Sequence, residues 1–214
     1  LCYDTSSKLE KILLIYLMAA EKREEISMDL ISQLQIFHPW NEQEEHDRNE
    51  LLRRLKSGEE LYSRENASAH LTASAWIISP DVRQVLLAYH NLYDSWAWLG
   101  GHADGERDLL SVALKEAQEE SGLNVIRPVS SDIYSLEILT VDGHEKRGRY
   151  VPSHLHLNIT YLLEASPAEA VRCKPDENSR VGWFPPEEAE AASSEPWFRE
   201  RIYSKLNAKL ADFH

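Results

Sequence analysis

The hydrophobic periodicity of the chain changes at about residue 68, and this change divides the sequence into two parts. Before it, apolar residues recur at helical spacing in three stretches. These stretches span residues 6–25, 28–37 and 42–61. After it, residues 69–78 alternate apolar and polar side chains, and a turn leads to a second strand over 84–90. We therefore predict a helical extension over residues 1–66 and a mixed α/β domain over residues 67–214.

The second part continues with strands, a helix, more strands and a final helix. We expect the further strands over residues 96–99, 133–141, 154–163 and 181–184, and the helices over 109–121 and 197–213. Gly122 ends the first of these helices, as glycine commonly does. This order predicts an α+β fold in which helices cover a mixed sheet.

Charge and cysteine content exclude several classes of function. The formal net charge is -13, so general binding to DNA, RNA or anionic lipid would be repulsive. The two cysteines, Cys2 and Cys173, form no CxxC pair, and this indicates a reducing, cytoplasmic setting and disfavours a thiolate zinc site. The longest strongly apolar run, 12–20, is far shorter than a membrane span.

Three glutamates on one predicted helix carry the strongest chemical signal. Glu116, Glu119 and Glu120 stand at i, i+3 and i+4, on the same face as the apolar residues of the preceding turns. Near a protein surface, two unit charges about 4 Å apart repel by about 4 kcal/mol. A divalent cation removes this repulsion, and carboxylate oxygens suit Mg²⁺ or Mn²⁺. The spacing therefore predicts a metal site for a phosphate-bearing substrate.

A glycine-rich loop precedes this helix. Gly100, Gly101 and Gly105 allow positive φ angles and a close approach of the backbone to a ligand. The loop and helix together resemble the signature of the Nudix hydrolases, G-x5-E-x7-R-E-U-x-E-E-x-G-U, where U is aliphatic. The matching residues are Gly100, Glu106, Glu116, Ala117, Glu119, Glu120, Gly122 and Leu123. Eight residues rather than seven precede the basic position, which is Lys115 in place of arginine.

The resemblance implies an α/β/α sandwich over about residues 68–214 and a Nudix-type pyrophosphohydrolase. It implies that Glu116, Glu119 and Glu120 bind Mg²⁺ or Mn²⁺ during cleavage of a nucleoside diphosphate derivative. Members often use a further glutamate from a later loop, and Glu177, just before the strand at 181–184, is the candidate here. We predict catalytic roles for Glu119, Glu120 and Glu177, with Glu119 or Glu177 accepting the proton of the attacking water.

Two further groups are candidates for the substrate pocket. His154, His156 and Asn158 share one face of a predicted strand, where they could bind a metal, contact substrate or form a polar wall. Lys146, Arg147 and Arg149 form a basic cluster that could hold phosphates or lie in a solvated hairpin tip. We take Arg147, Arg149 and His154 as the substrate-binding candidates.

The expected activity is hydrolysis of the diphosphate linkage of an NTP, a nucleotide-sugar or a dinucleotide. One alternative is a module that binds a nucleotide without cleaving it and uses the N-terminal helices as an effector arm. Another is isoprenoid diphosphate isomerisation, which Cys173 disfavours because of its position. We expect a small-molecule partner, no nucleic acid and no membrane, and the apolar N-terminal helices could join two copies as a homodimer.

Overall fold

The computed structural model describes residues 28–146 and 148–211. The predicted helix over 6–25 and the substrate-binding candidate Arg147 lie outside these ranges. Among the described residues, no helix combines the length and the apolar character needed to cross a membrane.

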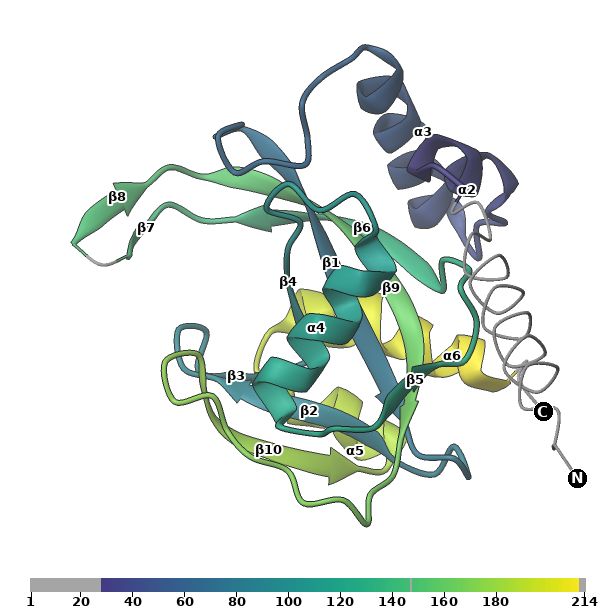
Figure 1. The fold of residues 1–214 in the computed structure, drawn as a ribbon, viewed down its shortest axis with the longest axis vertical. Coiled ribbons are helices and arrows are strands. Elements are labelled where there is room, and N and C mark those ends of the chain that lie inside the picture. The colour runs from purple at the N-terminus through teal and green to yellow at the C-terminus, as the bar shows by residue number, and fades with distance from the viewer. Residues whose placement is uncertain (1–27, 147, 212–214) are drawn as a thin grey trace, which may run out of the picture.

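The centre of the fold is a mixed sheet with the strand order β10-β2-β1-β9-β5. Three shorter strands extend it, because β3 pairs with β2, β4 with β1 and β6 with β9. The strands are β1 Ala69–Ile78, β2 Val85–His90, β3 Ser95–Ala97, β4 Leu99–His102, β5 Ile126–Pro128, β6 Ser135–Val141, β9 His154–Ala165 and β10 Asn178–Phe184. The long strands β1 and β9 run parallel over their whole shared length, with Ala69 opposite Leu155 and Ile78 opposite Glu164. A separate hairpin of β7, His144–Lys146, and β8, Arg149–Val151, projects from the body (Figure 1).

Helices cover the sheet and its edges (Figure 1). They are α2 Leu30–Ile36, α3 Glu42–Lys56, α4 Leu109–Ser121, α5 Pro186–Ala192 and α6 Ser204–Leu210, with the π-helix η1, Phe198–Tyr203, directly before α6. The alternation predicted for β1 sorts its side chains between two apolar cores. Leu71, Ala73 and Ala75 belong to the core beneath α4, whereas Trp76 packs in a second core with α5, η1 and α6. The predicted α+β sandwich is confirmed.

Several boundaries differ from the predicted ones for local reasons. The helix predicted over 42–61 ends at Lys56, where Gly58 adopts a positive φ of 77°. The strand predicted over 96–99 is interrupted at Trp98 and gives β3 and β4. Helix α5 was not predicted; Pro186 stands in its first turn, where a missing amide hydrogen costs nothing. Within the described residues, the predicted tail helix begins as the π-helix Phe198–Tyr203 and continues as α6.

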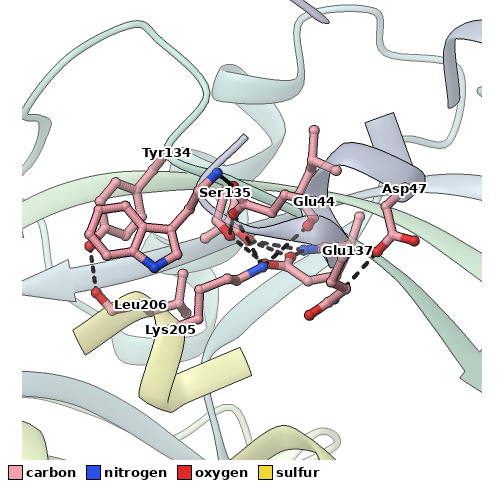
Figure 2. A network of polar contacts seen from close by, with 12 residues as sticks. Glu44, Asp47, Tyr134, Ser135, Glu137, Lys205 and Leu206 are labelled. Carbon is pink, nitrogen blue, oxygen red and sulfur yellow. Dashed lines mark hydrogen bonds and ion pairs between the residues drawn. The ribbon is translucent and has the colours of Figure 1, made fainter. Parts of the chain in front are cut away.

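A polar layer lies on the sheet face opposite α4 and joins α3 to α6 (Figure 2). Glu137 on β6 accepts hydrogen bonds from Asn158 on β9, at 3.0 Å, and from Lys205 on α6, at 2.9 Å. Lys205 and Lys209 also lie 3.2 Å and 2.8 Å from Glu44 on α3. Helix α3 is therefore tied to α6 through buried charges, and apolar residues of α2 and α3 share the core beneath α4.

Candidate active site

Helix α4 has clear start and stop signals, and these set the direction of its glutamates. The Asp108 carboxylate caps the first turn by accepting a hydrogen bond from the Ser111 amide at 3.2 Å. At the other end, Gly122 adopts a left-handed φ of 69°, and its amide donates to the carbonyl of Gln118. Between these ends, the apolar face of α4 packs on the sheet, as the periodicity predicts.

The three glutamates of α4 do not share one environment. Glu120 is 6% exposed and Glu116 is half-buried, so both continue the inward face of the helix. The side chain of Glu119 is 42% exposed and lies at the rim, where Lys174 and Lys115 contact it at 3.0 Å and 3.8 Å. Of the three predicted glutamates, Glu116 and Glu120 are therefore the inner carboxylates, and Glu119 is the outer one.

Glu177 joins the two inner glutamates from a distant part of the chain. Carboxylate oxygens of Glu116, Glu120 and Glu177 all lie within 4.8 Å of one another. Asn178, which is buried beside Glu177, holds this loop against α4, because its amide donates to the backbone carbonyl of Glu120 at 3.0 Å. The backbone amide of Lys174 in turn donates to the Asn178 side chain at 3.0 Å, which closes the loop.

The two adjacent glycines of the signature lie in strand β4 and are needed for close packing. The Gly100 amide donates to the Glu120 carboxylate at 3.2 Å. A Cβ atom on Gly101 would stand 2.5 Å from the carboxyl carbon of Glu116, and one on Gly100 would stand 2.5 Å from the Ala73 carbonyl oxygen. The positive φ predicted for the loop occurs at Gly105, at 95°, whereas Gly100 and Gly101 serve the predicted close approach.

Crowding and burial make the inner carboxylates hard to ionise. Burial raises the pKa of Glu120 to about 8, although the Gly100 amide opposes this shift. Burial also raises the pKa of Glu116; Lys174 opposes the shift, and the charges of Glu119 and Glu177 add to it. The inner cluster therefore brings together more carboxyl groups than the described side chains can hold in the ionised form.

Lys174 is the main basic group at the rim, and the sequence prediction missed it. Its ammonium nitrogen lies 3.0 Å from Glu119 and 3.1 Å from Glu177. The hydrogen bond from Lys174 lowers the pKa of Glu119. The spacing of Lys174 and Glu177, three residues apart in one turn, could have indicated their ion pair. No local sequence feature indicated that Glu119 would contact this turn.

Two of the predicted substrate-binding residues, Arg149 and His154, lie on other elements than this cluster. Arg149 is exposed on β8 of the projecting hairpin (Figure 1). His154 begins β9 and is buried, with its Nε2 atom 3.2 Å from that of His156. Together with His70 and His102, these two histidines form a second cluster on three strands.

Comparison with known proteins agrees with this site. The model of the NUDIX domain matches residues 68–206, which include the glycine strand, helix α4 and the Glu177 loop. The chain belongs to the Nudix family. It is accordingly a pyrophosphohydrolase, an enzyme that acts on phosphoric anhydrides of nucleotides in general. No curated protein matches the chain.

Solved structures of Nudix proteins resemble the domain weakly. A Nudix hydrolase from M. smegmatis, RenU, is 15% identical with a TM-score of 0.49 over 68% of this chain and 88% of its own. The dihydroneopterin triphosphate pyrophosphohydrolase of E. coli is 13% identical with a TM-score of 0.48, over 68% and 97%. The Ap4A hydrolase of C. elegans is 18% identical with a TM-score of 0.45, over 67% and 96%. The family assignment rests on the domain match.

Proposed function

We propose that the chain is a Mg²⁺- or Mn²⁺-dependent hydrolase of the diphosphate linkage in a nucleoside diphosphate derivative. The observation that carries this proposal is the convergence of Glu116, Glu120 and Glu177 within 4.8 Å beside the Gly100 and Gly101 backbone. Such a set of oxygen donors fits a hard divalent ion, which prefers a few carboxylates shared with substrate phosphates. The raised pKa values of Glu116 and Glu120 support the same assignment, because a cation would compensate this crowded charge.

Glu116 and Glu120 would hold the ion from the helix, and Glu177 would hold it from the loop. Glu119 would complete the set at the rim once Lys174 turns toward the substrate. When bound, the ion would lower the pKa of a water molecule and neutralise phosphate charge. Glu177 or Glu119, both partly exposed, would accept the proton of the attacking water. Lys174 would bind a substrate phosphate, because its ammonium group lies beside the partly exposed carboxylates of Glu119 and Glu177.

The projecting hairpin and the start of β9 would supply the rest of the substrate contacts. We propose that Arg147 and Arg149 bind phosphate and that His154 lines the pocket. Both arginines belong in sequence to the segment that joins β6 to β9, and His154 is the first residue of β9, so this segment could contact a ligand at that end of the sheet.

A substrate panel tests the proposal. Purified protein is incubated with nucleotide-sugars, dinucleotides and NTPs, with Mg²⁺, with Mn²⁺ and after chelation, and released phosphate is read with and without a phosphatase. We expect turnover of at least one class that chelation abolishes. Glu177→Gln and Glu119→Gln separate the two candidate bases, because loss of the true base should lower kcat by about 10²- to 10⁴-fold.

Glu188→Gln, at an exposed position on α5, is the matched control and should keep full activity. Absence of metal-dependent turnover across the whole panel would contradict the proposal. Tight nucleotide binding by the folded wild type without any turnover would instead identify a binding module.

A further inference from the structure

Four histidines from three strands gather at one end of the sheet, on a different strand face from the carboxylate cluster. His70 lies on β1, His102 on β4, and His154 and His156 on β9. The strand register explains the gathering, because His70 stands opposite His156 and the neighbouring position Thr72 stands opposite His102. The ring centroids of His70, His102 and His156 lie 4.9–5.1 Å apart.

Three of these rings are close enough to share one ion. His70, His102 and His156 each offer a ring nitrogen, and these nitrogens lie within 4.8 Å of one another. Zinc–nitrogen bonds of about 2.0–2.1 Å place the nitrogens of a tetrahedral site about 3.4 Å apart. His102 and His156 are only partly buried, so modest side-chain rotations would close the remaining gap. The separation of 3.2 Å between the Nε2 atoms of His154 and His156 shows that rings here already approach this closely.

His70 is oriented as a ligand. It is 5% exposed, and its Nδ1 atom lies 3.1 Å from the backbone carbonyl of Asn66. A contact with a carbonyl oxygen requires a hydrogen on Nδ1, so Nε2 of the neutral ring carries the lone pair. Among the described residues, nothing hydrogen-bonds to this buried Nε2 atom. Metal-binding histidines commonly use one nitrogen in this way for a backbone carbonyl and the other for the ion.

The ligand chemistry of the cluster favours a transition metal over a phosphate or Mg²⁺. A neutral, buried imidazole is a poor partner for an anion. It is a good ligand for transition metals, whereas carboxylates and waters suit Mg²⁺.

We propose that His70, His102 and His156 bind a transition-metal ion of the zinc class, with His154 positioning His156. Three imidazoles would leave one coordination position open at the partly exposed side. Because His102 directly follows Gly100 and Gly101, the ion would fix the end of the strand that packs against Glu116. The inference does not depend on diphosphate hydrolysis, because the carboxylate cluster lies outside this set of ligands.

Cobalt binding provides the test. Protein stripped of metal with a chelator is titrated with Co²⁺, and the visible absorption of tetrahedral cobalt is recorded. We expect one equivalent to bind, Zn²⁺ to displace it, and excess Mg²⁺ to leave the spectrum unchanged. His102→Asn and His156→Asn, which alter partly exposed side chains, should each weaken binding by about 100-fold or more, beyond the loss typical of outer-sphere changes.

Two controls separate the histidine site from other sites. His46→Asn removes a histidine whose side chain is 77% exposed on α3, and Glu116→Gln removes a carboxylate of the proposed Mg²⁺ site. Both should retain the cobalt spectrum. Imidazole ¹⁵N resonances of the unsubstituted protein should shift for the cluster histidines on addition of Zn²⁺, and this measurement needs no variant to fold.

The proposal is overturned if the wild type binds neither ion stoichiometrically. It is also overturned if the two cluster variants bind as tightly as His46→Asn, or if Glu116→Gln abolishes the spectrum. Since these experiments measure metal binding, their outcome neither supports nor contradicts the proposed hydrolase activity, which the substrate panel tests separately.

Discussion

Replacement of Lys205 by methionine should be among the most destabilising single changes in the chain. The Lys205 ammonium nitrogen lies 2.9 Å from Glu137 and 3.2 Å from Glu44, and the three side chains are almost fully buried (Figure 2). Methionine fills a similar volume but leaves two buried carboxylates without their shared cation; among the described residues, Lys209 then remains as the ion-pair partner of Glu44.

The size of the effect follows from the geometry. At an effective dielectric of about 20, each of these ion pairs has a gross attraction of roughly 5–6 kcal/mol. Desolvation offsets much of this gain, and breaking a buried pair by removing one partner typically costs about 3–5 kcal/mol. We therefore expect Lys205→Met to lower the free energy of unfolding by about 3–5 kcal/mol.

Urea denaturation with linear extrapolation measures this change. Lys56→Met, at an exposed position near the end of α3, is the matched control and should change stability by less than about 0.5 kcal/mol. In Lys205→Met combined with Glu137→Gln, part of the loss should be recovered, because one uncompensated charge is removed with its partner. A loss below about 1 kcal/mol with an unchanged m value would refute the argument that Lys205 compensates both carboxylates.

Three other predictions concern Glu44, Glu120 and Gly101. Burial alone would raise the pKa of Glu44, but Lys205 and Lys209 lower it below its ordinary value of 4.5. The ionised Glu44 carboxylate therefore contributes fully to stability above pH 4.5, and this contribution disappears as the pH falls through the lower pKa of the folded state. The free energy of unfolding should accordingly depend less on pH in the acid range in Glu44→Gln than in the wild type. Glu120→Gln should abolish turnover yet stabilise the metal-free protein at pH 7 by roughly 1–3 kcal/mol in thermal or urea unfolding, because the pKa of Glu120 is raised to about 8 and each pKa unit is worth about 1.4 kcal/mol. Gly101→Ala should reduce kcat while the protein stays folded, because the added methyl group would displace the Glu116 carboxylate; unchanged kinetics would show that this carboxylate is not needed in its place.

The sequence predicted the parts of the site that depend on local spacing. Helical periodicity placed Glu116 and Glu120 on the inward face of α4, and the glycine pair predicted a close backbone approach that Gly101 provides. The same periodicity could not show that Glu119 lies at the rim, because its position depends on Lys174, 55 residues away in the chain. The contact between Lys174 and Glu119 depends on how the loop before β10 packs against α4, and no local sequence pattern encodes this packing.

Long-range pairing accounts for the rest of what was missed. The alternation in β9 put His154 and His156 on one face, but the parallel register of β1 and β9 was needed to bring His70 beside them. The buried partnership of Glu44 with Lys205 likewise joins residues from opposite ends of the described chain. In the sequence, Glu44 is one of many acidic residues on an apparently solvated helix.

This partnership also limits how far the protein can be shortened. A version that begins at residue 67 would contain the whole strand domain, including Lys205 and Lys209, but would lack Glu44. Lys209 would then lie against the aromatic ring of Tyr134 without its carboxylate partner, and the apolar residues that pack against α3 would be exposed to water. Expression of the signature-bearing segment by itself should therefore give aggregated or poorly folded material, whereas a version that keeps α3 should remain in solution.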